Sequence, residues 1–198
     1  MRRVTTVRSK AIPLSRANVD TDQIIPAKYL KRIERTGYGP FAFEAWRADP
    51  SFVLNDRRYD GAEILIAKQN FGSGSSREHA VWALEGLGIR AVIAPSFADI
   101  FKNNCFQSGL LTVELPEEDV DYLIARCEEL PATQVEVDLA SQTVRVGGGA
   151  WERRFEVDPF KKYRLARGLD DIAMTLEYEP DVAAFEATRP AFLPSTAR

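Results

Sequence analysis

Short apolar runs alternate with helix-like apolar stripes through the middle of the chain. The runs at 63–67, 90–94 and 110–113 have the length and composition of buried strands. After each run, apolar residues recur at three- and four-residue spacing, which predicts amphipathic helices. The three stripes are Ala80, Ala83, Leu84 and Leu87; then Phe97, Ile100, Phe101 and Cys105; then Val120, Leu123, Ile124 and Cys127.

Local signals mark the ends of these helices. The first helix is expected from about Ser76 to Leu87, because a glycine follows and stops it. Ser96 and Asp99 have the spacing of a capping box for the second helix. Pro116 and the acidic residues after it suit the N-terminus of the third, since carboxylates are favoured at that end of a helix dipole.

The hydrophobic period changes to two in the last third of the chain. Apolar residues alternate with polar ones at 135–139, 144–146 and 151–157, which predicts antiparallel strands. Turns are expected between them at 140–142 and at the three glycines of 147–149.

More helices are expected toward the C-terminus. One begins at Asp158 and closes at Gly168, and Asp170 caps another that runs through Leu176. Pro180 separates this helix from a polar C-terminal helix and tail.

The elements together predict an α/β fold with mixed strand pairing. We expect a sheet that closes toward a barrel, with helices packed around it. The length suits one domain over residues 1–198, with a C-terminal helical extension over about 159–198.

Residues 20–60 do not follow this organisation. The segment contains several turn-forming residues between short apolar stretches, namely Pro26, Gly37, Gly39, Pro40 and Pro50. A short helix is expected just after Pro26, because proline is favoured in the first turn of a helix. Irregular segments of this size in compact domains are uncommon and are usually functional or lid-like, so either role is expected here.

Composition and charge exclude several classes of protein. Hydrophobic residues make up 45% and charged residues 28%, as in ordinary globular proteins, and the net charge is −3. Nothing in this balance predicts binding to nucleic acid or to an anionic membrane. No run approaches the ~18 apolar residues of a membrane span, and the N-terminus lacks the apolar core of a signal peptide. A site for an acidic ligand would therefore need local positive charge.

The chain has two cysteines and one histidine. Cys105 and Cys127 form no CxxC pair, so they cannot supply a Cys₄ zinc site or a complete set of iron–sulfur ligands. A single histidine excludes a multi-histidine metal site, and we expect no metal site in this chain. Both cysteines fall on apolar stripes and are expected to pack in the core. Low cysteine usage suits a reducing cytoplasm.

The most informative stretch is Asn70-Phe-Gly-Ser-Gly-Ser-Ser-Arg-Glu-His-Ala80, between a predicted strand and a predicted helix. Its two glycines, Gly72 and Gly74, allow a tight turn and close approach of a ligand to the backbone. The helix N-terminus offers free N–H groups and a partial positive charge to an anion. Arg77 can grip a carboxylate through two parallel hydrogen bonds. These residues describe a carboxylate site on a net acidic protein.

Structural roles explain the same residues equally well. Ser75 and Glu78 fit the S-x-x-E pattern, so Ser75 could act only as a helix cap. His79 could be an ordinary first-turn histidine, and the Gly–Ser loop a simple connection. The lysine of a phosphate-binding P-loop is missing and G-x-G-x-x-G does not occur, so nucleotide binding is not predicted.

Motifs along the chain resemble a known superfamily. Gly74-Ser-Ser-Arg-Glu-His-Ala80 matches the swivelling domain of the aconitase superfamily, and Val19-Asp-Thr-Asp-Gln-Ile-Ile-Pro26 resembles its other hallmark. Asp158-Pro-Phe, Gly168-Leu-Asp-Asp-Ile172 and Arg189-Pro-Ala-Phe-Leu-Pro194 are similar to the family of bacterial 3-isopropylmalate dehydratase small subunits. The resemblance runs nearly end to end and keeps the motif order. It implies a swivelling β/β/α domain and a role in leucine biosynthesis in the cytoplasm.

The resemblance also implies a two-chain hydro-lyase. In that family 2-isopropylmalate loses water to give 2-isopropylmaleate, which is hydrated to 3-isopropylmalate. A separate large subunit would be the partner and would hold the [4Fe–4S] cluster, with no cofactor in this chain. The cysteine count agrees, since this chain cannot bind such a cluster alone.

The resemblance assigns roles to the loop residues. Ser75 would be the base that takes the carbon-bound proton, with its alkoxide stabilised by the helix N-terminus, nearby N–H groups and Arg77. Arg77 would clamp a substrate carboxylate, and Ser76 would contact the substrate or an oxyanion. Ser73 and Gly74 complete the expected substrate-binding set.

Other residues are expected to act around this set. Glu78 and His79 would orient the loop. Asp20 and Asp22 would order it or contact the partner, although two aspartates before an apolar run are also ordinary capping residues.

A specificity loop is expected between residues 29 and 38. Tyr29, Leu30, Ile33 and Tyr38 offer apolar surface that could reach over the substrate and receive its isopropyl group. Local packing of the same residues is the alternative. Three other functions stay open: a related hydro-lyase subunit acting on citraconate, methylmalate or homoaconitate; a dicarboxylate-binding regulatory module; and a mainly structural subunit.

Overall fold

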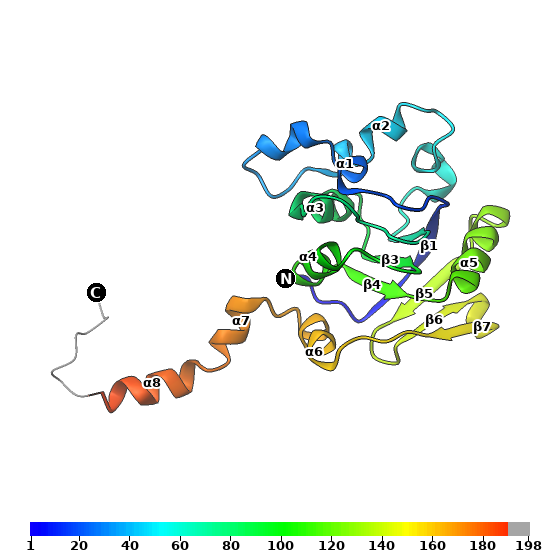
Figure 1. Ribbon diagram of the computed structural model, residues 1–198. Coiled ribbons are helices and arrows are strands. Elements are labelled where there is room, and N and C mark those ends of the chain that lie inside the picture. The colour runs from blue at the N-terminus through cyan, green and yellow to red at the C-terminus, as the bar shows by residue number, and fades with distance from the viewer. Residues whose placement is uncertain (190–198) are drawn as a thin grey trace.

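One mixed sheet of seven strands organises the computed structural model, which describes residues 1–189 (Figure 1). The strands lie in the order β4-β3-β2-β1-β5-β6-β7. Their bounds are β1 (Thr6–Leu14), β2 (Ile64–Ala67), β3 (Ala91–Ala94), β4 (Leu111–Glu114), β5 (Gln134–Asp138), β6 (Thr143–Val146) and β7 (Trp151–Arg154). The expected α/β fold with mixed pairing is confirmed.

The helices follow the strands as the apolar stripes predict. The α-helices are α1 (Thr21–Ile24), α2 (Glu44–Arg47), α3 (Glu78–Gly86), α4 (Asp99–Ser108), α5 (Glu117–Glu129), α6 (Pro159–Arg167), α7 (Asp171–Leu176) and α8 (Glu179–Ala187). Short 3₁₀ helices are η1 (Ala27–Lys31), η2 (Gly39–Phe41), η3 (Val53–Asn55), η4 (Arg57–Tyr59) and η5 (Gly147–Gly149).

Strand β1 is where the two kinds of pairing meet. Its first half, residues 6–10, runs antiparallel to β5, and its second half, residues 11–14, runs parallel to β2. The parallel strands β2, β3 and β4 continue on one side and the antiparallel strands β5, β6 and β7 on the other. Because β1 changes partner along its length, the sheet curves into a half-barrel with helices around it (Figure 1).

The pattern of the sequence did not predict β1. Burial alternates over its first residues and then becomes continuous, so neither the period-two pattern nor a plain apolar run describes the whole strand. Pro13, which cannot donate to a ladder, also argues against a strand at that position.

The sheet separates two hydrophobic clusters. In β2, Leu65 faces a cluster with α3, α4 and residues 38–62, whereas Ile64 and Ile66 face a second cluster with α5 and the antiparallel strands. Both faces of the parallel strands are therefore covered, which explains why their residues read as continuous apolar runs.

Much of the irregular segment 20–60 belongs to the core. The side chains of Phe43, Phe52 and Tyr59 are buried in the cluster with α3 and α4. The Phe43 N–H donates to the carbonyl of Ile24 at 2.8 Å, which joins the middle of the segment to its start. The expected lid-like role is thus wrong for residues 38–59, which form a layer of the core. The short helix expected after Pro26 is confirmed as the 3₁₀ helix η1.

Two expectations for α4 are wrong. Its N-cap is Ala98, and no side chain caps it; the Ser96 hydroxyl instead accepts a hydrogen bond from the Asn70 N–H at 2.9 Å. Ile100 was expected on the buried stripe of this helix, but its side chain is largely exposed. Phe101 and Cys105 are buried as expected.

The C-terminal helices have the predicted ends. Asp158 caps α6 through the N–H groups of Phe160 and Lys161, and Gly168 closes it in the left-handed conformation. Asp170 caps α7. Beyond α6 the chain leaves the half-barrel, and α7 and α8 extend away from it (Figure 1). Of the motif at 189–194, everything after Arg189 lies outside the described residues.

We predict that Gly72→Ala destabilises the fold more than Gly61→Ala. Both glycines have φ near +75°, so both variants share the backbone strain. A Cβ on Gly72 would lie 2.1 Å from Cγ of Phe101, whereas a Cβ on Gly61 meets nothing within 4 Å. Overpacking adds about 1–3 kcal/mol to the cost at Gly72. Urea unfolding of the two variants measures the difference, and equal free energies of unfolding would contradict the close contact.

Candidate functional site

The loop between β2 and α3 lies against the segment that follows β1. The N–H groups of Gly72 and Ser73 donate to the carbonyl of Val19 at 2.8 and 3.2 Å. The Thr21 N–H donates to the carbonyl of Ser73 at 2.9 Å, and the Thr21 hydroxyl donates to the carbonyl of Ser75 at 2.7 Å. The two motifs singled out in the sequence therefore form one structure, although about fifty residues separate them.

The same loop is held on its other side by the segment that follows β3. The Phe71 N–H donates to the carbonyl of Ser96 at 3.1 Å, and the Ala98 N–H donates to the carbonyl of Phe71 at 3.0 Å. Phe71 and Phe101 add an edge-to-face ring contact at 5.4 Å. The loop thus sits between two extended segments that continue the parallel order of the sheet.

A cavity of about 250 Å³ opens beside this loop. One part of its lining is made by Gly74, Ser75, Ser76 and Arg77, and another part by the start of α4. The remaining lining comes from Thr21 and Gly72, and the residues at the start of α4 are Ala98, Asp99, Ile100 and Phe101. Four of the five residues predicted to be catalytic or substrate-binding therefore share one surface.

Arg77 lies at the start of α3 and forms an ion pair with Asp22 through Nη1. Its side chain is only 14% exposed, while that of Asp22 is 54% exposed. A guanidinium has five N–H donors, so the contact with Asp22 leaves donors for a carboxylate in the cavity. Asp22 also restricts the orientation of Arg77, which reduces the entropy that a ligand must remove on binding.

Ser75 is not the cap of α3. The N-cap position belongs to Arg77, and no side chain makes a capping hydrogen bond there. The alternative in which Ser75 serves only as a helix cap is therefore wrong. Ser75 and Ser76 are exposed residues of the cavity wall. The first N–H groups of α3 have no carbonyl partner within the helix, so this wall also favours negative charge.

Ser73 and Asp20 have structural contacts. The backbone of Ser73 pairs with Val19 and Thr21, and Ser73 is not among the residues that line the cavity. Asp20 caps α1, because its carboxylate accepts from the Gln23 N–H at 2.8 Å while the Gln23 side chain accepts from the Asp20 N–H at 3.0 Å. The capping interpretation of Asp20 is confirmed.

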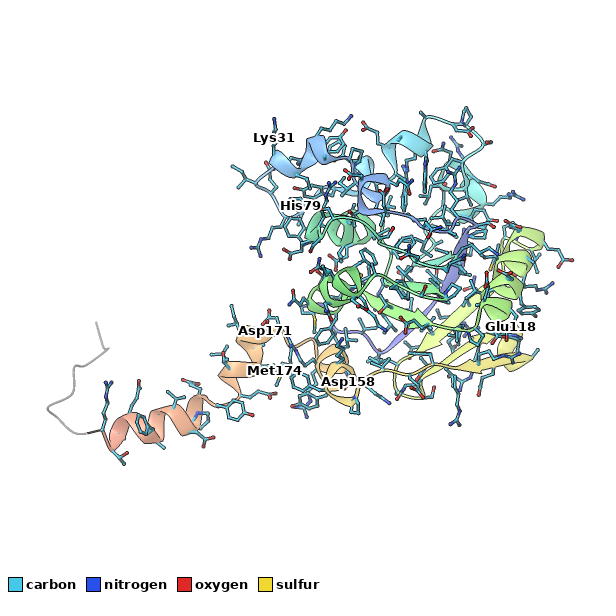
Figure 2. All side chains as sticks on the ribbon, viewed as in Figure 1. Lys31, His79, Glu118, Asp158, Asp171 and Met174 are labelled. Atoms are coloured by element: carbon cyan, nitrogen blue, oxygen red, sulfur yellow. The ribbon has the colours of Figure 1, made fainter. Side chains whose placement is uncertain are left out.

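His79 packs against the core rather than into the cavity. Its ring centroid lies 5.5 Å from that of Tyr38 and 4.7 Å from that of Trp82. Burial lowers the pKa of His79 below its usual value. Figure 2 shows His79 at the edge of α3, and Glu78 beside it is exposed. Their expected role in orienting the loop stays a prediction.

The four residues of the expected specificity loop do not share a surface. Tyr38 is fully buried in the core, so the expectation that it meets a substrate is wrong. The Tyr29 ring stacks on that of Phe41 with 4.1 Å between centroids, and its hydroxyl donates to Glu44 at 2.7 Å. Tyr29 therefore packs locally, which was the alternative to a substrate contact. Leu30 is half-buried, and Ile33 is 95% exposed beyond the end of η1.

Sequence reasoning missed Thr21 and Ile100 as parts of the cavity. Thr21 lies between Asp20 and Asp22 in the sequence. Its place in the cavity depends on its hydrogen bonds with the loop, which no local pattern predicts. Ile100 has helical spacing from other apolar residues, which favoured a buried position. The position of Ile100 did carry a signal. It lies beside Asp99 in the first turn of a helix that follows a strand, and ligands commonly bind at the edge of the sheet where such helices begin.

Both cysteines are confirmed as core residues with free thiols. Burial raises the pKa of Cys127 to about 11 and that of Cys105 well above its usual value. Within residues 1–189, no group of three or more His, Cys, Asp or Glu side chains is placed to hold a metal ion. None of the helices in that range is long and apolar enough to span a membrane.

Comparisons with known proteins agree with this arrangement. Residues 1–118 match the family model of the aconitase C-terminal domain, and residues 121–159 match the model LeuD_N. A protein of Rubrobacter xylanophilus named 3-isopropylmalate dehydratase small subunit is 56% identical, over 98% of each chain. One of the same name from Parafrankia sp. is 53% identical, over 100% of each chain.

A solved structure shares the fold. The crystal structure of 3-isopropylmalate dehydratase from Methanocaldococcus jannaschii is similar with a TM-score of 0.67 and 26% sequence identity. The similarity covers 91% of this chain and 99% of that one.

We predict that the single histidine titrates below its usual pKa of 6.5. Burial between Tyr38 and Trp82 penalises the charged imidazolium, so the folded pKa lies below the unfolded one. Stability is then lost as the pH falls from about 6.5 through the folded pKa, since the unfolded chain binds the proton first.

The Hε1 resonance of His79 follows this titration by NMR without overlap from another histidine. The same protein in urea gives the unfolded reference. A folded midpoint equal to or above that reference would contradict the packing of His79.

Proposed function

Because the chain belongs to the family of 3-isopropylmalate dehydratase small subunits, we propose that its loop at residues 72–77 supplies one side of the active site of that hydro-lyase. The protein is the small subunit of an enzyme that interconverts 2-isopropylmalate and 3-isopropylmalate in leucine biosynthesis, and it works with a large subunit. The proposal for the loop is carried by one observation: Ser75, Ser76 and Arg77 line a single cavity.

Arg77 binds a carboxylate of the substrate in this proposal. Both substrate isomers carry two carboxylates, and a guanidinium binds such a group with two parallel hydrogen bonds. The net charge of −3 gives no long-range attraction for an acid, so a local cation is needed. Asp22 acts on Arg77 as a positioning residue, because its ion pair fixes the guanidinium at the cavity wall.

Ser75 moves the proton of the reaction. In the dehydration direction its oxygen takes the proton from the substrate carbon, while the hydroxyl on the neighbouring carbon leaves with its electron pair and the double bond forms. In the rehydration direction Ser75 returns the proton to the other carbon. A serine alkoxide needs stabilisation, which Arg77 and the free N–H groups of α3 can provide. Ser76 contacts the substrate from the same wall.

The two cysteines of this chain do not fit an iron–sulfur cluster. Cluster ligands are thiolates, whereas burial raises the pKa of both thiols and keeps them protonated in the core. We therefore assign the [4Fe–4S] cluster of the family to the large subunit, where, when bound, it supplies a Lewis acid for the leaving hydroxyl. The free thiols also suit the cytoplasm, to which we assign the protein.

The segment around η1 remains the candidate for recognition of the isopropyl group. Ile33 and Leu30 carry the apolar surface that is left after Tyr38 is excluded. Contacts of this kind discriminate by about 1–3 kcal/mol per methylene-sized feature. A few such contacts would separate 2-isopropylmalate from citraconate-derived or homoaconitate substrates.

We predict that Ser75→Ala and Arg77→Lys damage the reconstituted enzyme in different ways. Ser75→Ala removes the proton-transfer group and should lower kcat by about 10²–10⁴-fold. Arg77→Lys keeps the charge but loses the bidentate geometry, and should lower kcat/KM by about 10–100-fold, mainly through KM. Both values are measured with 2-isopropylmalate and saturating large subunit.

Ser15→Ala and Arg57→Lys are the matched controls, because both residues are exposed and lie outside the cavity. The controls should keep wild-type kinetics. If Ser75→Ala and Arg77→Lys were as active as their controls, the roles proposed for the loop would be wrong.

A further inference from the structure

The C-terminal arm, defined as residues 169–189, exposes a row of large apolar side chains. Their exposure runs from 50% for Val182 to 72% for Ile172. The row consists of Ile172, Leu176, Tyr178, Val182 and Phe185. Single exposed apolar residues are ordinary, but several in succession on one segment mark an interaction surface.

Spacing places these residues on one face of each helix. Ile172 and Leu176 are four apart on α7, and Tyr178, Val182 and Phe185 follow at four and three across the start of α8. Such spacing gives a continuous apolar stripe along a helix. The arm therefore carries a stripe of large apolar side chains that are exposed and face no part of the half-barrel (Figure 1).

The root of the arm is fixed to the body by polar contacts. Arg164 of α6 pairs with Asp171 at 2.6 Å, and the Tyr163 hydroxyl donates to Glu177 at 3.2 Å. The N-terminal ammonium also pairs with Asp170 at 3.4 Å. These contacts orient α7 on α6, so the arm is directed outward from the protein before any partner binds.

The arm is also strongly acidic. Its acidic residues are Asp170, Asp171, Glu177, Glu179, Asp181 and Glu186, and Arg189 is its one basic residue. Asp170, Asp171 and Glu177 pair with groups of the body, which leaves the three carboxylates of α8 beside its apolar stripe. That combination fits a partner groove that is apolar at its floor and basic at its rim.

We propose that this arm docks into such a groove on the large subunit. The proposal rests on the proposed function, which supplies that partner. The aconitase C-terminal domain model and LeuD_N end before the arm, at residues 118 and 159, yet the relatives named small subunits match the chain over nearly its full length. The arm is therefore part of the small subunits rather than of the superfamily domain.

A separate subunit has a physical need for such a contact. A domain within one chain is held near its partner by the linker, which gives a high effective concentration, whereas a separate chain must gain its affinity from buried surface. Position favours the same partner: α4 begins at the cavity and ends next to Gly109, which lies against the N-terminal residues, and the N-terminal ammonium pairs with Asp170 of the arm. One large subunit that covers the cavity can also meet the arm.

The test uses the full-length chain with Val182→Ser and Phe185→Ser combined. The matched control combines Ala184→Ser and Ala187→Ser, which adds two serines to the opposite side of α8. Binding to the large subunit is measured without substrate by isothermal titration calorimetry. We expect the stripe variant to bind at least about tenfold more weakly than the control. With saturating large subunit its kcat should equal that of the wild type.

Other outcomes would overturn the docking proposal. Equal affinity of the stripe variant and the control would show that the large subunit does not use the stripe. A wild-type chain that sedimented alone as a dimer, and a stripe variant that was monomeric with unchanged affinity for the large subunit, would assign the stripe to a second copy. If the wild-type pair bound but did not turn over 2-isopropylmalate, the proposed function would fail, while the binding comparison would still decide the role of the arm.

Discussion

The hydrogen bonds between Val19–Thr21 and the loop after β2 are the interaction on which the site depends. Strands β1 and β2 are parallel neighbours, so the segments that leave their carboxyl ends emerge at the same edge of the sheet. The loop then pairs with the first segment on one side and with residues 96–98 on the other. Gly72 permits this pairing for two reasons: glycine readily adopts the positive φ found there, and the absence of a Cβ leaves room for the Phe101 ring. These hydrogen bonds hold Ser75, Ser76 and Arg77 at the cavity, although all three precede the first residue of α3.

The positive charge of Arg77 is balanced by Asp22 of the same chain, while Arg77 keeps N–H donors for a ligand in the cavity. Asp22 offsets Arg77 and fixes its direction, which allows a mostly buried guanidinium on a protein of net negative charge. The serine hydroxyls and the N-terminus of α3 favour an anion without adding a second cation. Such a surface can bind and orient a dicarboxylate and can move a proton. The cysteines are buried and protonated, and in our proposal the large subunit activates the leaving hydroxyl.

Prediction from the sequence succeeded where one physical rule decided the structure. Strands β2, β3 and β4 read as continuous apolar runs because both of their faces are covered, and α5 has an unbroken apolar stripe. Strand β1 was missed because its two halves obey different patterns, and Tyr38 and Phe43 gave no periodic signal although they are core residues. The residues proposed to bind a carboxylate followed from residue types, and four of them line one cavity. The pairing of their loop with Val19–Thr21, which ordered the site, depends on tertiary contacts that no local pattern contains.

In our proposal the loop at residues 72–77 forms one side of an active site that the large subunit completes. Hydrogen–deuterium exchange of this chain, alone and with saturating large subunit, shows whether the partner covers the loop. We expect slower exchange in peptides that cover residues 74–79 when the large subunit is present, with the buried strands β2 and β3 as the internal reference. Exchange in those peptides that is the same with and without the large subunit would contradict the proposal.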